Sequence, residues 1–301
     1  MFRKIAVLVS TPLLLAAACA SEGDGDAVQV NTAEAAMSSL QAAPDAVADA
    51  GTGKLRMVME MTVMGEPLEL VATGAYDAAA QQMSMSMDMG AMFEQMAAVG
   101  GEQIPLELGD GVLEMVADGD TVYMRSSLFE MFAGTRGWLS LRATDLSSDA
   151  GSLGLGAAAS DPTKILESLR GVTSEPEVVG QEDVDGVETT HYRATLSLAD
   201  ALAEVPESQR AEVEAALGQL GRVGDAEVPV DVWIDGEGLP RRMTVDMGAA
   251  FGAIAGEAAG ATMTIELFDY GQPVDIAIPP ADEVTPFSEV MAGLGSFGSA
   301  S

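Results

Sequence analysis

Apolar and polar side chains alternate along two stretches of this chain, which is the pattern of a strand with one buried face. In residues 55–63 the odd-numbered positions are all Leu, Met or Val, and in residues 83–89 they are all Met. Side chains two positions apart on a strand share a face, so each stretch presents one apolar surface. The turn sequence Gly65-Glu66-Pro67 predicts a return strand from Leu68. The three segments therefore predict an antiparallel meander with one apolar and one polar face.

The remaining pattern predicts more strands joined by short turns, together with a few helices. Helices are expected at 31–50, with a kink or break at Pro44, at 91–99, from Asp161, and at 199–220. Further strands are expected at 112–117, 121–125, 137–141, 177–182, 187–198, 228–235, 239–247, 262–270 and 274–278. Strands linked by tight turns form antiparallel sheets, and the helices must cover the apolar face. The predicted class is therefore α+β.

Methionine is concentrated on the predicted apolar face. Of the 19 methionines, 13 lie between Met57 and Met131. Methionine is flexible and polarizable, so it suits a cavity that adapts to apolar ligands, although a loosely specified closed core explains the pattern equally well. The residues predicted to line such a cavity are Leu55, Met57, Met59, Met61, Val63, Met83, Met85, Met87 and Met89.

The N-terminus has the layout of a bacterial export signal. Arg3 and Lys4 precede an apolar core from Ile5 to Leu15, and three alanines lead to Cys19, the only cysteine. This arrangement resembles a lipobox, in which the cysteine is acylated with fatty acids such as palmitate and the preceding residues are removed. The usual leucine three residues before the cysteine is replaced by Ala16. An ordinary secretory signal cut near Ala18 is the alternative.

The charge balance excludes one large class of partner. The chain has 14 Lys and Arg against 47 Asp and Glu, and its formal net charge is −33. Binding to nucleic acid requires a basic surface, so nucleic acid is excluded as a partner. The acidic residues are spread along the chain, which is typical of adaptation to salt or of general solubility. After the signal, no apolar run reaches the length of a membrane-spanning helix.

Catalysis has little support in the sequence, and the chain is predicted not to be an enzyme. His191 is the only histidine and lies within an alternating segment, where a packed or surface residue is expected rather than a general base. The pairs Asp118/Asp120 and Asp183/Asp185 are explained by turn chemistry and lack the continuation of a calcium loop. No catalytic residue, metal ligand or cofactor is predicted.

Three segments of the C-terminal half together resemble a known family. They run from Gly180 to Tyr192, from Pro229 to Arg242, and from Phe268 to Pro279. In this order they resemble the LppX/LprG lipoproteins of actinobacterial envelopes, which share the fold of the periplasmic carrier LolA. The resemblance covers residues 31–285 or so. It implies a LolA-like half-barrel, which is an incompletely closed antiparallel barrel wrapped over helices.

The resemblance also implies a function. Members of this family hold acylated lipids or glycolipids in an apolar cavity and carry them across the aqueous envelope space. The expected organisation is a signal peptide at 1–18, an acidic tether at 19–30, a single lipid-binding domain at 31–286 and a flexible tail at 287–301. The expected location is the extracytoplasmic face of the cell membrane, with a lipid anchor on Cys19 and an envelope transporter or acceptor protein as a further partner. The alternative is a tethered structural or protein-binding module without a lipid cavity.

Overall fold

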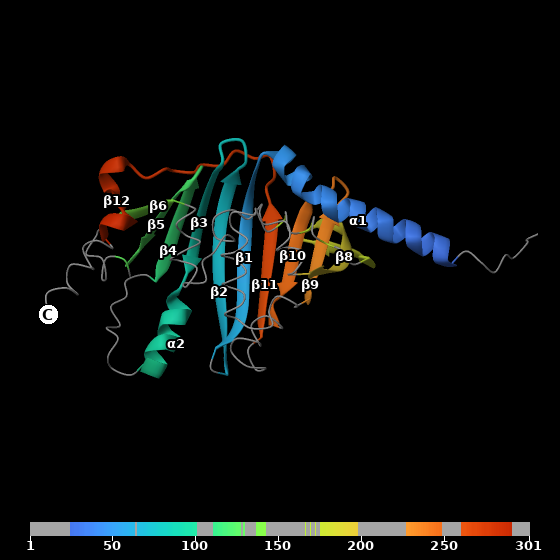
Figure 1. The fold of residues 1–301 in the computed structure, drawn as a ribbon, viewed down its shortest axis with the longest axis horizontal. Helices are drawn as coiled ribbons and strands as arrows, with labels where there is room; N and C mark the ends of the chain where they lie inside the picture. The colour runs from blue at the N-terminus through green and yellow to red at the C-terminus, as the bar shows by residue number, and fades with distance from the viewer. Residues whose placement is uncertain are drawn as a thin grey trace, which may run out of the picture.

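The computed structural model describes residues 25–63, 65–100, 111–127, 129, 137–142, 166, 169, 172, 175–197, 227–248 and 260–290. Figure 1 shows a broad sheet with a long helix across it. In chain order the elements are α1 (Gly25–Ala50), β1 (Thr52–Val63), β2 (Glu66–Asp77), β3 (Gln82–Asp88), α2 (Gly90–Gly100), β4 (Val112–Asp118), β5 (Thr121–Ser126), β6 (Trp138–Arg142), β7 (Glu177–Val184), β8 (Val187–Ser197), β9 (Glu227–Asp235), β10 (Pro240–Asp246), β11 (Ala261–Phe268), the short 3-10 helix η5 (Ala281–Glu283) and β12 (Val284–Pro286).

The described strands form one open sheet in the order β12-β6-β5-β4-β3-β2-β1-β11-β10-β9-β8-β7. The neighbours in this order are antiparallel, apart from the short parallel pair of β12 with β6. The two outermost strands, β12 and β7, do not pair with each other, so the sheet does not close. The predicted class, an incompletely closed antiparallel sheet with few helices, is confirmed.

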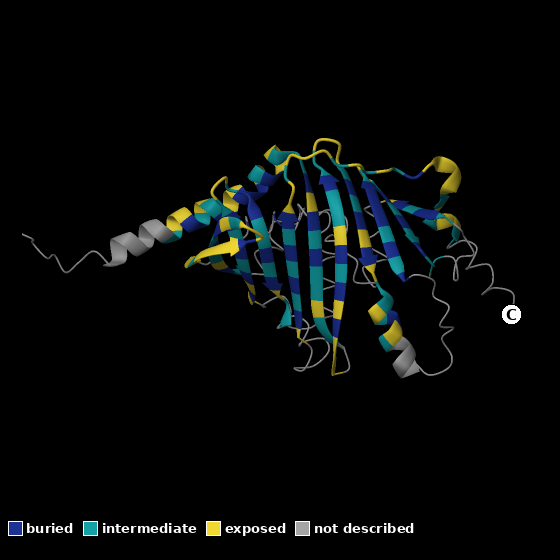
Figure 2. Cartoon of the chain, turned by 180° about the vertical axis from the view of Figure 1, so that it is seen from behind, coloured by how far each residue is buried: buried dark blue, intermediate teal, exposed yellow. Residues whose placement is uncertain are grey.

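The two faces of the sheet differ as the alternation predicts. On β3, Met83, Met85 and Met87 are buried, whereas Ser86 and Asp88 are exposed. Figure 2 shows this banding along the strands from behind. We call the face that carries Leu55 and Met85 the inner face, and the opposite one the outer face. The inner-face side chains belong to one apolar cluster that also contains Leu40, Ala43 and Val47 of α1.

Helix α1 differs from its prediction in length and in continuity. It begins at Gly25, earlier than the predicted residue 31, and it continues through Pro44 without a break. Leu40, Ala43 and Val47, which flank the proline, are each 0% exposed. The burial of these side chains against the sheet outweighs the loss of one backbone hydrogen bond at the proline. The helix contacts β1, β7 and β9, and Figure 1 shows it crossing the β1–β8 half of the sheet.

The predicted strand at 274–278 is wrong. Residues 273–280 are extended but belong to no strand of the sheet. Pro273, Pro279 and Pro280 lack the backbone N–H that a ladder requires, which accounts for the failure to pair. The predicted helices at 199–220 and after Asp161 lie almost wholly outside the described residues, and so does the tail beyond Val290. The domain boundaries therefore stay predictions.

Candidate functional site

Cross-strand register places inner-face side chains of six neighbouring strands in one row. The row runs from β1 to β6 across five antiparallel pairs. Its members in this order are Leu55, Gly74, Met85, Met115, Met124 and Leu139. Directly opposed side chains on antiparallel strands lie within about 5.5 Å of each other, so the row forms a continuous apolar surface.

Gly74 is the one position of this row without a side chain. A Cβ there would lie 2.4 Å from the backbone oxygen of Ser84, closer than any real contact. The close approach of β2 to β3 therefore requires glycine. It leaves a gap between Leu55 and Met85 that the flexible methionine side chain is suited to fill.

The residues predicted from the sequence share the inner face of β1 and β3. Leu55, Met57, Met83, Met85 and Met87 are buried, with exposed fractions of 0, 5, 4, 4 and 9%. Met59, Met61 and Met89 are half-buried, and Val63 ends β1 with a side chain outside the described set. Strand β2 joins the two groups, because Met57 and Met87 both lie opposite Ala72. Leu55, Met57, Met83, Met85 and Met87 thus belong to one apolar cluster, with Met59 and Met89 packed against it; the role of the predicted residues in binding stays a prediction.

Sequence reasoning missed four further methionines of the same surface. Met115, Met124, Met243 and Met263 are buried at 3, 4, 0 and 7% exposure on β4, β5, β10 and β11. Strands β5 and β11 alternate buried and partly exposed residues throughout, and β4 and β10 do so over part of their length. The alternating pattern of these strands could have indicated the four methionines. A single methionine among Val and Leu residues is, however, less conspicuous than the four alternating methionines of residues 83–89.

Very few polar groups interrupt the inner face in the described part of the chain. Ser126, Thr189 and His191 are the buried polar or charged residues, and only Ser126 continues an inner-face series, after Val122 and Met124 on β5. Tyr76 on β2 is 3% exposed, and within the described part of the chain its hydroxyl has no hydrogen-bond partner. Burial raises the pKa of this phenol above its usual range.

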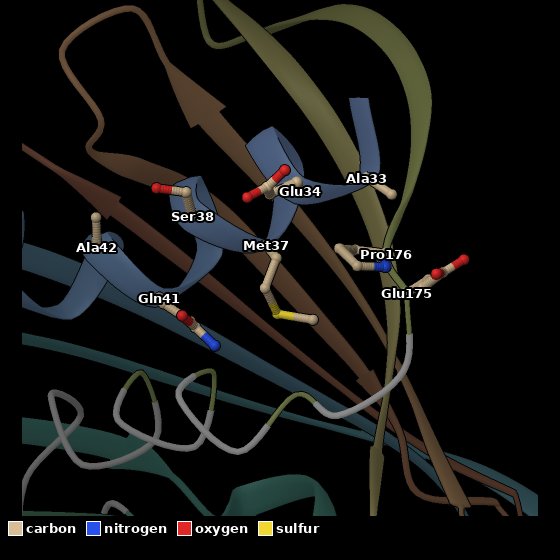
Figure 3. Close-up of a pocket in the computed structure, with 8 residues that line it drawn as sticks. All are labelled: Ala33, Glu34, Met37, Ser38, Gln41, Ala42, Glu175 and Pro176. Carbon is tan, nitrogen blue, oxygen red and sulfur yellow. The ribbon is translucent and has the colours of Figure 1, made fainter. Parts of the chain in front are cut away.

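A pocket of about 630 Å³ lies between α1 and the segment that leads into β7. Figure 3 shows its lining residues, which are Ala33, Glu34, Met37, Ser38, Gln41, Ala42, Glu175 and Pro176. Met37 also packs against the inner-face cluster. The side chain of Met37 therefore connects the pocket to the apolar interior.

A second pocket, of about 830 Å³, lies at the rim where α1 ends and β1 begins. It is polar, with ion pairs between Lys54 and Asp269 at 2.9 Å and between Arg241 and Asp235 at 2.7 Å. The Arg241 guanidinium lies over the ring of Tyr270, with 5.0 Å to the ring centroid. The Tyr270 hydroxyl donates to the carbonyl oxygen of Pro240, which fixes this rim.

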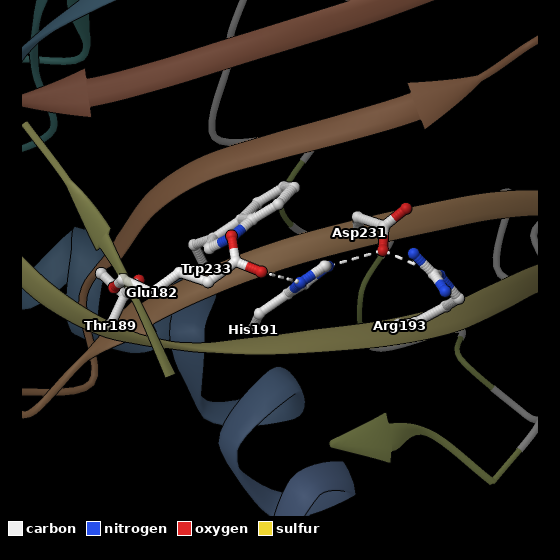
Figure 4. Close-up of polar contacts among 6 residues, drawn as sticks. All are labelled: Glu182, Thr189, His191, Arg193, Asp231 and Trp233. Carbon is white, nitrogen blue, oxygen red and sulfur yellow. Dashed lines mark hydrogen bonds and ion pairs between the residues drawn. The ribbon is translucent and has the colours of Figure 1, made fainter. Parts of the chain in front are cut away.

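The outer face carries a polar cluster centred on His191 (Figure 4). The Nδ1 atom of the ring lies 3.0 Å from Oε1 of Glu182, and Nε2 lies 2.6 Å from Oδ1 of Asp231. The ring stacks on Trp233, with 4.2 Å between centroids. Of the two predicted alternatives, a packed or a surface residue, His191 is therefore the packed one, and within the described residues its ring nitrogens contact two carboxylates.

Glu182 is held as a carboxylate by this cluster. The Trp233 indole N–H donates to its Oε2 at 2.8 Å. That hydrogen bond, followed by the one from His191, lowers the pKa of Glu182 below its usual range. Hydrogen bonds to the charged form of a carboxyl favour ionisation.

Of the aspartate pairs, Asp183 makes a turn hydrogen bond and Asp118 makes a cross-strand one. Asp183 Oδ1 accepts a hydrogen bond from the backbone N–H of Gly186, and Asp118 Oδ1 accepts one from the Gln82 side chain. Within the described ranges, no group of three or more His, Cys, Asp or Glu residues is placed to hold a metal ion. Among these same residues, no helix has both the length and the hydropathy needed to cross a bilayer.

Comparison with known proteins gives distant relatives. No family model matches the chain. An uncharacterized 31.2 kDa protein from the rplA-rplJ intergenic region of Streptomyces griseus is 26% identical over 254 residues, which cover 80% of this chain and 73% of that protein.

Solved structures with a similar chain trace include the lipoprotein LppX and the protein LprF, both from mycobacteria. LppX of Mycobacterium tuberculosis is 14% identical with a TM-score of 0.48, and the match covers 81% of this chain and 99% of LppX. LprF of Mycobacterium bovis is 17% identical with a TM-score of 0.40, over 82% and 98% of the two chains. A LolA superfamily protein of Nitrosomonas europaea is 9% identical with a TM-score of 0.29, over 80% and 94%.

Proposed function

We propose that this chain is a lipid-anchored envelope protein that binds the acyl chains of a lipid or glycolipid between the inner face and α1. The observation that carries the proposal is the continuous inner face itself. Apolar side chains occupy one side of neighbouring strands from β6 to β9, and methionines are placed on β1, β3, β4, β5, β10 and β11. The resemblance to the LppX/LprG lipoproteins points to the same function.

The energetics of such a surface suit acyl chains. Each buried methylene contributes about 0.8 kcal/mol, so one long chain supplies tight binding with little dependence on the headgroup. Methionine side chains rearrange at low cost around chains of different length. Met37 gives a route from the pocket beside α1 to the apolar interior, because it contacts both.

The proposed activity is transfer of the bound lipid across the aqueous space of the envelope. An open sheet permits this because α1 and the sheet are separate elements, and parting them exposes the inner face. Release then requires a membrane, transporter or acceptor protein that receives the acyl chains.

A charge placed on the inner face tests the proposal. Met59 is half-buried on the inner face of β1, and its neighbour Val58 is half-buried on the outer face of the same strand. We expect Met59→Asp to lose lipid that co-purifies from the native host, because a carboxylate cannot be buried among acyl chains without a partner. Val58→Asp is the matched control and should retain the lipid. Native mass spectrometry of both variants measures the bound mass.

Two further results decide between this function and the alternative. Met59→Asp must keep a cooperative thermal transition, since loss of lipid from an unfolded chain says nothing about binding. If the folded wild-type protein from its own host carries no lipid, the carrier function is wrong, and a protein-binding module becomes the better account.

A further inference from the structure

The imidazole of His191 lies between two carboxylates that come from different strands. Glu182 is on β7 and Asp231 is on β9, while His191 is on the strand between them. The two nitrogen–oxygen distances, 3.0 Å to Glu182 and 2.6 Å to Asp231, are both hydrogen-bond distances. The histidine side chain is only 6% exposed, so water does not replace either partner freely.

Two carboxylate partners require two N–H donors on the ring. A carboxylate only accepts, and a neutral imidazole carries one N–H and one lone pair. In the neutral ring one of the two contacts would therefore bring a nitrogen lone pair against a negatively charged oxygen. The imidazolium form donates to both, and charge-assisted hydrogen bonds of this kind are the strong ones.

Hydrogen-bond donors and positive charges also surround the two carboxylates. On β8, Arg193 donates to Asp231 Oδ1 at 3.0 Å. On β10, the Arg242 guanidinium lies 5.8 Å from the centroid of the Trp233 ring, which itself donates to Glu182. The charged groups around the ring are thus Glu182 on β7, Asp231 on β9, Arg193 on its own strand and Arg242 on β10.

We propose that Glu182, His191 and Asp231 form a proton-binding site, whose bound proton fastens the edge strand β7 to β8 and β9. Strand β7 pairs only with β8 in the described sheet, and its bonding register shifts between Val178 and Gly180. The Glu182–His191 contact therefore supplements a ladder that is irregular and lies at the edge of the sheet. Occupancy of the site is independent of any lipid.

The proton-binding site is connected to the pocket beside α1 through strand β7. Glu175 and Pro176 line that pocket and lead directly into β7. Loss of the ring proton removes one link between β7 and the strands behind it. The wall of the pocket that β7 supports should then become more mobile as the pH rises.

The protonation state of the ring is directly measurable, because the chain contains one histidine. Long-range proton–nitrogen correlation spectra of the full-length protein should show both ring nitrogens protonated at about pH 6. Asp231→Asn and Glu182→Gln should each lower the affinity for the second proton, by about threefold or more for Asp231→Asn. Glu188→Gln is the matched control, since Glu188 is an exposed carboxylate on the same hairpin and should leave the ring signals unchanged.

Hydrogen exchange tests the consequence for the strand. The linkage has a definite sign: the charged ring stabilises the attachment of β7, so protection is greatest at low pH and falls as the ring loses its proton. Protection factors in β7, corrected for intrinsic exchange, should fall about three- to tenfold between roughly pH 5.5 and 8 in wild type and in Glu188→Gln. The fall should be absent in Glu182→Gln, whose circular dichroism confirms that it is folded.

The proposal is overturned by either of two results. One is a singly protonated ring at about pH 6 whose spectrum is unchanged in Glu182→Gln and Asp231→Asn. The other is equal pH dependence of β7 protection in wild type and Glu182→Gln. Neither result affects the lipid-binding proposal, which is measured by bound mass.

Discussion

Two tyrosine side chains, Tyr76 and Tyr270, differ in whether the hydroxyl has a hydrogen-bond partner. The Tyr76 hydroxyl is buried without a hydrogen-bond partner in the described chain, and its ring packs so closely that a Cβ on Gly53 would lie 2.6 Å from the oxygen. The Tyr270 hydroxyl donates to the carbonyl oxygen of Pro240. Burial raises the pKa of both phenols above their usual range, so both side chains are neutral at ordinary pH.

This contrast predicts stability changes of opposite sign for the same substitution. Tyr76→Phe removes an unsatisfied buried hydroxyl and should raise the free energy of unfolding by about 1 kcal/mol. Tyr270→Phe breaks a hydrogen bond and should lower it by about 1 kcal/mol. Chemical denaturation of the two variants beside wild type measures the difference. A loss of stability in Tyr76→Phe would show that its hydroxyl has a partner.

The contact partners of individual residues could not be predicted from the sequence. The alternation around His191 correctly placed it on a strand, as a packed or surface residue. Its carboxylate partner Asp231 lies 40 positions away, and Trp233 lies 51 positions from the Glu182 to which it donates. With so many acidic residues in the chain, no local pattern distinguishes these two carboxylates from the others. Only the register of β7, β8 and β9 brings them to one ring.

Whole elements were more predictable than contacts, because strands and tight turns have local signatures. The meander of β1, β2 and β3 follows from alternation and from the turn at Gly65, and α2 lies within one residue of its predicted bounds at each end. The errors arose where tertiary packing overrides a local signal. Helix α1 passes through Pro44 because its apolar stripe is buried, and the segment after Pro273 stays unpaired because its prolines lack donors.

The packing of α1 gives a test at the scale of the element. Leu40 is 0% exposed and belongs to the cluster that joins α1 to the sheet. Its neighbour Ser39 is half-buried, and the Ser39 hydroxyl donates a hydrogen bond to the carbonyl oxygen of Ala35. We expect Leu40→Ala to lower the free energy of unfolding by about 2–5 kcal/mol through lost burial and a cavity. Ser39→Ala should change it by less than about 0.5 kcal/mol.

Denaturation curves of the two variants decide the point. An equally small effect of Leu40→Ala would mean that α1 does not depend on the sheet for its stability. In that case, burial of the α1 side chains would not explain how the helix continues through Pro44 without one backbone hydrogen bond.

At the scale of the whole molecule, the two faces of the sheet separate two kinds of chemistry. The inner face is apolar across most of its width, and several basic residues of the outer face pair with acids. Arg56 and Arg242 share Glu266, at 3.3 and 2.8 Å, and Arg125 pairs with Glu114. The chain also carries a net charge of −33, so the bulk surface of an anionic membrane should repel it.

Cys19 lies outside the described residues, and its acylation would give the chain a membrane anchor. We propose that this cysteine is the acylated N-terminus, and two or more acyl chains would hold the protein firmly where one gives marginal binding. Cys19→Ala should move the protein from the membrane fraction to the soluble fraction at low and at high salt, since no electrostatic contact remains to hold it. Ser21→Ala, two residues further on, is the matched control and should stay with the membrane.

Mass spectrometry of the N-terminal peptide should show the acyl groups on wild type and on Ser21→Ala alone. Retention of Cys19→Ala in the membrane fraction would contradict the anchor and favour the ordinary secretory signal cut near Ala18.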